Sequence, residues 1–141
     1  MLTERDIVQM FREGIDCSMI VLAEANTGMT KEEAYRIASC FGAGMFTGGT
    51  CGAVTGALMA IGIKHGNHVM NDMPQKEKVL AKRSEFIRRF RDIHVSTDCP
   101  VLLGADLRDE EQRRRVRADG IMDKECPKFC ITAMRILEEI L

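Results

Sequence analysis

A glycine-rich stretch from residue 42 to residue 66 constrains the fold of this chain more than any other feature. It holds eight of the twelve glycines, and Cys51 lies near its middle. From Cys51 to Ile61, apolar side chains recur at helical spacing. Gly52 and Gly56 are four residues apart, so they share a helix face on which another backbone can approach closely. The stretch therefore predicts a turn followed by a central, closely packed helix.

Apolar residues at helical spacing, together with capping residues, predict further helices on both sides of this stretch. Thr30 begins a capping box that ends at Glu33, which places one helix start at this point. No segment alternates convincingly between apolar and polar residues at period two, so no sheet is expected. We predict an all-α fold, with residues 1–141 forming a single-domain bundle of five to seven helices around the glycine-rich helix. The expected helices cover residues 3–13, 17–26, 31–41, 51–65, 75–93, 99–103 and a C-terminal segment that begins at Cys126-Pro127.

Composition and charge exclude several classes of partner. The chain has 141 residues, 45% of them hydrophobic, and a net charge of −1, which is typical of a soluble globular domain and gives no reason to expect nucleic acid. The longest apolar run is too short to span a membrane, and the N-terminus has no signal-peptide core. We therefore expect a cytoplasmic protein with reduced thiols. The highly charged residues 105–124 favour a solvated helical face or a mobile insert over a binding patch.

The six cysteines form no C-x-x-C pair, so the zinc-finger and thioredoxin-type signatures are absent. Four of them stand where a helix is predicted to begin: Cys17, Cys51, Cys99 and Cys126. Unpaired N–H groups and the positive end of the helix dipole favour a thiolate at such a position. If these helix starts converge, the sulfurs form a soft anionic pocket. Such a pocket suits an iron–sulfur cluster, zinc, or a dithiol that cycles with a disulfide.

The spread of these motifs resembles the redox-active protein family named for its C_GCAxxG_C_C pattern. The resemblance rests on Cys17, residues 50–58 (TCGAVTGAL), residues 99–104 (CPVLLG) and Cys126. The chain departs from the pattern in two places, since Thr50 replaces a glycine and Gly52 is inserted after the cysteine. The resemblance implies a redox role for the four cysteines. This family is also similar to the iron–sulfur part of split-Soret cytochromes c, which implies cluster binding.

Three functions stay open at the level of sequence. The first is metal binding for electron transfer, with an iron–sulfur cluster as first choice and zinc as second, and with these ligands: Cys17, Cys51, Cys99, Cys126 and, as a substitute, Cys130. The second is thiol–disulfide chemistry or redox sensing, with Cys51 as nucleophile and another cysteine of the set as the resolving thiol. Cys51 and Cys99 are the candidate catalytic residues. The third is a helical interaction domain whose cysteines only pack, the usual role of a buried cysteine.

Further expectations concern the cofactor and the partners. Gly48, Gly49 and Gly52 are candidate cofactor contacts, because a backbone without side chains can lie close to a bound group. Covalent haem is not expected, because the chain has no C-x-x-C-H motif. A redox role requires a redox partner protein, and a homodimer is expected on general frequency alone.

Overall fold

The computed structural model describes all 141 residues and contains eight α-helices and one short 3-10 helix. The elements are α1 (Glu4–Arg12), α2 (Cys17–Glu24), α3 (Lys31–Ala38), η1 (Ala43–Phe46), α4 (Gly52–His65), α5 (Met73–His94), α6 (Cys99–Leu103), α7 (Glu110–Ala118) and α8 (Ile121–Ile140). Strand-like pairing is limited to one isolated antiparallel bridge, between Thr50 and Asp98. The all-α prediction is confirmed, although the structure has one α-helix more than the five to seven predicted.

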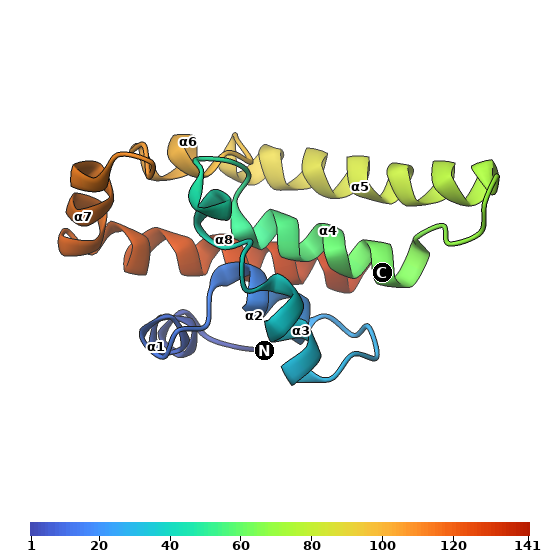
Figure 1. Cartoon of the computed structure of the whole chain (residues 1–141), viewed down its shortest axis with the longest axis horizontal. Helices are drawn as coiled ribbons and strands as arrows, with labels where there is room; N and C mark the ends of the chain where they lie inside the picture. Colours follow the sequence, from blue (N-terminus) through green and yellow to red (C-terminus); the bar gives the residue numbers. More distant parts are fainter.

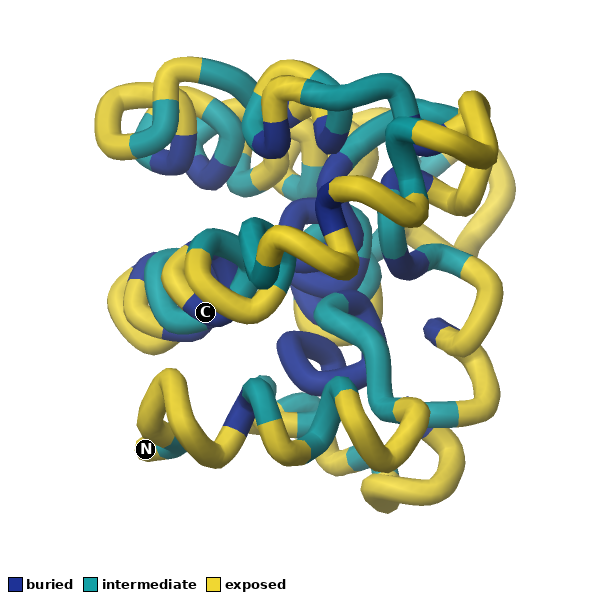
Figure 2. The backbone as a smooth tube through the Cα atoms, turned by 90° about the vertical axis from the view of Figure 1, so that its left-hand side faces the viewer, coloured by how far each residue is buried: buried dark blue, intermediate teal, exposed yellow.

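The helices form three layers, with α4 and α8 in the middle (Figure 1). The long helix α5 covers one side of this pair, and α1, α2 and α3 cover the other. The end-on view in Figure 2 shows buried backbone concentrated in the interior, and at least half of the residues in each of α4 and α2 are buried. The two aromatic residues Phe86 and Phe90 of α5 are completely buried against the middle layer. The glycine-rich helix is therefore central, as its sequence predicts.

Glycines allow α2 and α4 to cross at very short range. A Cβ atom added to Gly56 would lie 2.5 Å from the carbonyl oxygen of Ser18, closer than real Cβ atoms come to a backbone oxygen. The Ser18 hydroxyl is buried and donates a hydrogen bond to the carbonyl oxygen of Ala38, at 2.8 Å, which joins α2 to α3. The predicted close approach of another backbone to this face of α4 is confirmed.

Local capping explains why several helices begin where they do. The Thr3 side chain accepts a hydrogen bond from Asp6 N, and the Thr30 side chain accepts one from Glu33 N. Both are reciprocal capping boxes, because the Asp6 and Glu33 carboxylates accept from the threonine N–H groups. Asp72 also caps α5, whose first residue is Met73, because its side chain accepts a hydrogen bond from Gln75 N. These starts follow from short-range sequence signals.

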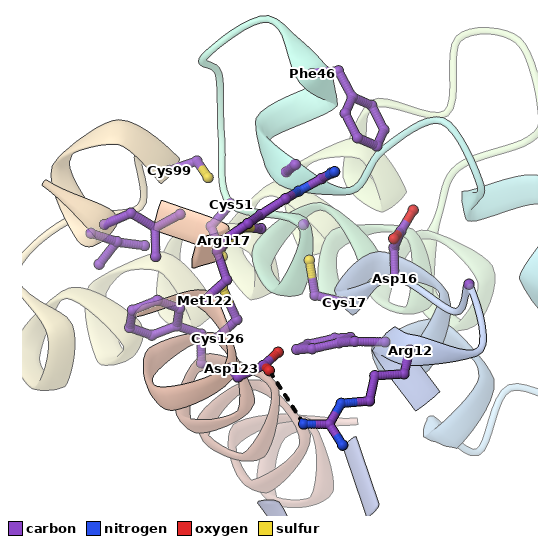
Figure 3. Close-up of a pocket in the computed structure, with 17 residues that line it drawn as sticks. Arg12, Asp16, Cys17, Phe46, Cys51, Cys99, Arg117, Met122, Asp123 and Cys126 are labelled. Atoms are coloured by element: carbon purple, nitrogen blue, oxygen red, sulfur yellow. Dashed lines mark ion pairs between the residues drawn. The ribbon is translucent and has the colours of Figure 1, made fainter. Parts of the chain in front are cut away.

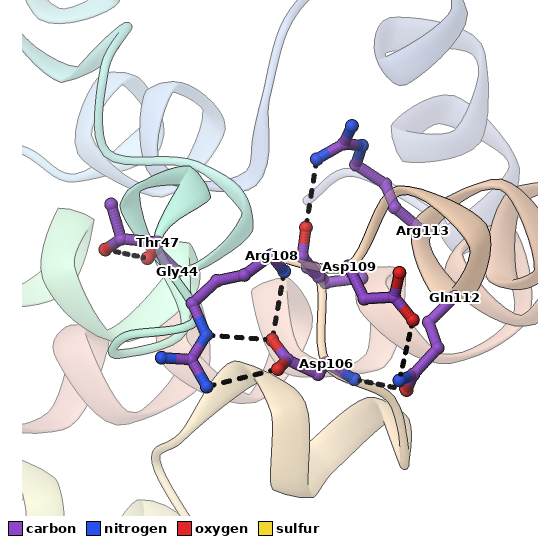
Figure 4. Close-up of polar contacts among 8 residues, drawn as sticks. Gly44, Thr47, Asp106, Arg108, Asp109, Gln112 and Arg113 are labelled. Carbon is purple, nitrogen blue, oxygen red and sulfur yellow. Dashed lines mark hydrogen bonds and ion pairs between the residues drawn. The ribbon is translucent and has the colours of Figure 1, made fainter.

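The charged segment after α6 forms an ordered turn and the separate helix α7 (Figure 4). The Asp106 carboxylate accepts hydrogen bonds from the backbone and side chain of Arg108, and Asp106 N donates to the side chain of Gln112. The Arg113 guanidinium donates to the carbonyl oxygen of Leu107, which is buried. The predicted helical face is present, and α7 is the helix that raises the count above the prediction.

The predicted start of the C-terminal helix at Cys126-Pro127 is wrong. Helix α8 begins at Ile121, after Gly120 in a left-handed conformation with φ 72°, and Pro127 lies inside it. A proline inside a helix removes one backbone hydrogen bond and normally breaks the helix. Here Pro127 is fully buried, and the apolar face of α8 packs against α2, α4 and α5. Tertiary packing therefore keeps the helix continuous through the proline.

Candidate functional site

Four of the six cysteines line a single cavity of about 470 Å³ at one end of the bundle (Figure 3). The four are Cys17, Cys51, Cys99 and Cys126. Apolar side chains make up most of the remaining wall, and charged side chains complete it: Phe11, Phe46, Leu102, Leu103, Met122 and Phe129, with Arg12, Asp16, Arg117 and Asp123. Side chains from helices far apart in the sequence therefore line the same cavity, as expected if the helix starts that carry the cysteines converge.

Each of the four thiols comes from a different helix or helix start. Cys17 and Cys99 are the first residues of α2 and α6, and Cys51 is the N-cap residue of α4. Cys126 instead lies in the second turn of α8, because that helix begins at Ile121. The predicted placement at helix N-termini is confirmed for three cysteines and is wrong for Cys126.

A pair of backbone hydrogen bonds holds Cys51 beside Cys99. Cys51 N donates to Thr97 O at 2.8 Å, and Cys99 N donates to Gly49 O at 3.0 Å. These bonds flank the isolated antiparallel bridge between the two segments. In an antiparallel pairing, alternate residues point to the same face, so Cys51 and Cys99 are diagonal neighbours on one face. The bridge therefore fixes the relative position of two thiols that are 48 residues apart in the sequence.

The sulfur of Cys17 lies directly against Gly52, in space that a side chain would fill. A Cβ atom on Gly52 would lie 2.3 Å from Cys17 Sγ and 3.1 Å from the Cα atom of Gly42. The absence of a side chain lets the thiol lie directly against the first turn of α4. Backbone N–H groups of Ala43 and Ser18 oppose the effect of burial on the pKa of this thiol, because they would stabilise negative charge on the sulfur.

The loop beside the thiols is strained. Ala43, Gly44, Met45 and Phe46 have φ values of 48°, 65°, 58° and 56°, so four successive residues are left-handed. A left-handed conformation costs about 1–2 kcal/mol for each residue that is not glycine. Strain of this kind tends to occur at functional sites. In this protein the left-handed conformation of residues 43–46 places Ala43 and Phe46 in the cavity wall. Apart from its glycines, the sequence gives no sign of this conformation.

The thiols of the metal-free protein are neutral, which corrects the prediction that they are thiolates. Burial raises the pKa of the Cys99 thiol to about 12, with a further contribution from Cys17. Burial also raises the pKa values of the Cys17, Cys51 and Cys126 thiols above the ordinary value. The cost of removing a thiolate from water exceeds the stabilisation by the helix N-terminus. Only a bound cation, which favours the deprotonated thiol, would reverse this balance.

The four thiols interact electrostatically in every pairing. A charge on Cys17 raises the pKa values of the Cys51, Cys99 and Cys126 thiols, and the same holds among those three. In this conformation, however, no three His, Cys, Asp or Glu side chains are placed to hold one metal ion. The sulfurs therefore share a cavity without converging on a single point.

The chain matches the model of a protein family described as "Putative redox-active protein (C_GCAxxG_C_C)" over residues 15–140. The chain belongs to this family. The name of the family contains four cysteines, and four cysteines line the cavity. Neither the curated proteins nor the solved structures contain a match to the chain. None of the helices has the length and apolar character needed to cross a membrane.

Helix α1 lies before the segment that matches the C_GCAxxG_C_C family, yet it contributes to the cavity. Phe11 and Arg12 line the wall, and the Arg12 guanidinium forms an ion pair with the Asp123 carboxylate of α8 at 3.8 Å (Figure 3). Only Ile7 of this helix is fully buried. The cavity of this C_GCAxxG_C_C protein is thus completed by an element that the family match does not include.

Of the remaining predicted site residues, one lies in the cavity wall and three lie outside it. Gly52 lines the cavity, whereas Gly48 and Gly49 do not. Cys130 is completely buried one helical turn after Cys126, also outside the lining. Cys40, which has no predicted role, is exposed. Asp16 could be expected near the site from its place directly before Cys17, whereas no sequence signal links Arg12, Arg117 and Asp123 to the cavity.

Proposed function

We propose that this member of the C_GCAxxG_C_C family is an electron-transfer protein whose four cavity thiols hold an iron–sulfur cluster. The observation that supports this most is the gathering of Cys17, Cys51, Cys99 and Cys126 around one cavity with largely apolar walls. Four cysteine thiolates are the usual ligands of such clusters. When bound, a cluster accepts and releases single electrons, and the proposal includes a redox partner protein that exchanges them. We place this activity in the cytoplasm, where thiols stay reduced.

The arrangement of the thiols favours a cluster over a single zinc ion. Zinc binds cysteine sulfur at about 2.3 Å, so four ligands must converge on one point. No three side chains converge in this way here. The irons of a cluster lie at separate corners, so its cysteine ligands stand farther apart. Thiols that share a cavity but do not meet at one point therefore fit a cluster better, and zinc is the second choice.

The chain itself supplies three conditions that a cluster requires. Cys51 and Cys99 are each 5% exposed, so the thiols lie largely out of contact with water. The apolar walls lower the local dielectric constant and strengthen the effect of nearby charges on a reduction potential. The N–H groups near Cys17 stabilise negative charge on its sulfur. Because the free thiols are neutral, binding must release protons, and affinity should rise with pH.

Anaerobic reconstitution with iron and sulfide tests this proposal. We expect the wild-type protein to become brown, with visible absorbance and with iron and sulfide in stoichiometric amounts. Cys51→Ser should prevent this, because it removes one of the four ligands. Cys40→Ser is the matched control, since Cys40 is an exposed cysteine outside the cavity. Equal cluster contents in the two variants, or no cluster in any of the proteins, would refute the proposal.

One observation supports a second function, thiol–disulfide chemistry. Cys51 and Cys99 are diagonal neighbours across the backbone bridge, and the Cα atoms in such pairs are about 7–8 Å apart. A disulfide requires a Cα separation below about 7 Å, so a small shift of the bridge is enough. If this is the function, mild oxidation of the metal-free protein should join Cys51 to Cys99, as peptide mapping by mass spectrometry would show. Oxidation that joins other cysteines, or none, would refute it.

A further inference from the structure

The mouth of the cavity carries two opposite charges that form no ion pair. Four charged residues line the cavity, and two of them, Arg12 and Asp123, form an ion pair with each other. The other two are Asp16 and Arg117. Arg117 forms no ion pair or hydrogen bond. Asp16 is the N-cap residue of α2, where its side chain faces the backbone N–H of Met19 in a capping-box arrangement, but its carboxylate forms no ion pair. The two groups influence each other electrostatically but do not touch.

Asp16 and Arg117 lie in the wall of the same cavity as the four thiols. Figure 3 shows the Arg117 side chain extending across the opening from α7, with its guanidinium towards Phe46 and Asp16. Asp16 and Cys17 are adjacent in the sequence, and both side chains point into the same space. A ligand in the opening would therefore meet a carboxylate, a guanidinium and a thiol at the same time.

We propose that Asp16 and Arg117 form a recognition subsite for a small zwitterionic sulfur compound, one that carries both an ammonium and a carboxylate group. The ammonium group binds the Asp16 carboxylate, and the carboxylate group binds the Arg117 guanidinium, which matches it with two parallel N–H donors. An anion without an ammonium group is repelled by Asp16, and a simple amine is repelled by Arg117. The sulfur atom of the ligand points towards the four thiols. Only this last feature rests on the proposed redox function.

Binding of S-methylcysteine to the protein as purified anaerobically tests the subsite, measured by NMR titration at pH 7. This probe has both charged groups, but its thioether cannot take part in thiol exchange. We expect it to bind at least about tenfold more tightly than methylthiopropionate, which lacks the ammonium group, or methylthioethylamine, which lacks the carboxylate. Single-charge analogues that bind as tightly as the zwitterion would overturn the inference.

Substitutions assign the effect to the two side chains. Arg117→Gln and Asp16→Asn should each weaken binding of S-methylcysteine about tenfold or more, the loss expected for one charge-assisted contact. Arg114→Gln is the matched control, because Arg114 is an exposed residue of the same helix outside the cavity lining and should leave binding unchanged. Arg117→Lys keeps the charge without the paired donors, so it should retain part of the affinity and show that the fold is intact.

Two further results would count against the subsite. If Arg117→Gln and Asp16→Asn bind like the wild type, the two residues do not form it. If no protein binds the probe, the facing charges have no ligand of this class. Iron analysis of the same samples separates this inference from the proposed function. A cluster without probe binding refutes the subsite alone, and probe binding by a protein that takes up no cluster on reconstitution refutes the electron-transfer proposal alone.

Discussion

Gly52 is the residue on which the position of the Cys17 sulfur depends. Alanine is the better helix former, by about 1 kcal/mol relative to glycine. At this position, however, the added Cβ atom would lie 2.3 Å from Cys17 Sγ and would be close to the backbone of the preceding loop as well. We expect Gly52→Ala to destabilise the protein by about 1–3 kcal/mol, the usual cost of overpacking, and to displace the thiol. Urea denaturation measures the change.

Gly62 provides the matched control in the same helix. No atom lies within 4 Å of the position that a Cβ atom would take there. Gly62→Ala should therefore stabilise the protein by about 0.4–1 kcal/mol, through the lower entropy of the unfolded chain. If both substitutions shift stability in the same direction, the proposed contact between Gly52 and Cys17 is wrong.

The raised thiol pKa values predict a loss of stability at high pH in the metal-free protein. An unfolded thiol ionises near pH 8.5, whereas the pKa of folded Cys99 is about 12. Below pH 8.5 both states hold the proton, so this contribution to stability is complete. Between these values the unfolded state binds fewer protons, so stability falls as pH rises, by about 1.4 kcal/mol per pH unit for each such thiol.

Urea denaturation at pH 8, 9 and 10 under reducing conditions measures this effect. Other groups also ionise in this range, so the comparison that matters is with a variant. Cys99→Ala removes one titrating thiol and should have a shallower dependence on pH than the wild type. Identical slopes for the two proteins would show that the Cys99 thiol is not held in its neutral form by the fold.

The sequence predicts the positions of several site residues, but not the ionisation state of the thiols. The gathering of Cys17, Cys51 and Cys99 follows from their places beside helix starts and from the glycines that let helices approach. The ionisation state of these thiols cannot be predicted from the sequence, because it depends on burial, which is a property of the whole packed molecule. The unpaired Asp16 and Arg117 belong to segments whose proximity no local pattern encodes.

At the scale of elements, α1 is a part of the cavity wall with few anchoring contacts. Ile7 is its one fully buried side chain, and the ion pair between Arg12 and Asp123 is exposed, so it contributes at most about 1 kcal/mol. We expect Ile7→Ala to release α1 from α8 without unfolding the bundle. Hydrogen exchange of the α1 amides should then become faster, while the exchange of α4 amides stays as in the wild type.

Arg5→Ala serves as the control for this experiment, because Arg5 is an exposed residue of the same helix. It should leave the exchange of α1 unchanged. If Ile7→Ala instead accelerates exchange in α1 and α4 equally, α1 is part of the cooperative core and not a separately attached wall. If neither region changes, Ile7 does not anchor the helix.

Helix starts differ in how well the sequence predicts them. Those of α1 and α3 follow from threonine capping boxes, which act over three residues and need no tertiary context. The start of α8 cannot be predicted from short-range sequence signals. Cys126-Pro127 has the sequence pattern of a helix start, but it lies inside the helix. The apolar face of α8 is buried by three other helices, and that packing outweighs the local preference of proline. The left-handed turn of η1 is likewise set by its surroundings.

At the scale of the whole molecule, one end of a three-layer bundle holds a cavity built from distant parts of the chain. The middle layer of α4 and α8 supplies Cys51 and Cys126, and the outer layers supply Cys17 and Cys99 (Figure 1). Loss of any one layer would therefore separate the thiols. The family match, which spans residues 15–140, covers all four of these contributions.

The central claim is that these four thiols act as one set, and alkylation mapped by mass spectrometry tests it most directly. The anaerobically reconstituted protein and the metal-free protein are treated with iodoacetamide under reducing conditions at pH 10, in incubations long enough for the buried, neutral thiols of the metal-free protein to react. We predict that Cys17, Cys51, Cys99 and Cys126 all become protected on reconstitution, while the exposed Cys40 reacts at the same rate in both forms. If any of the four reacts equally fast with and without the cluster, the thiols do not form a single binding site.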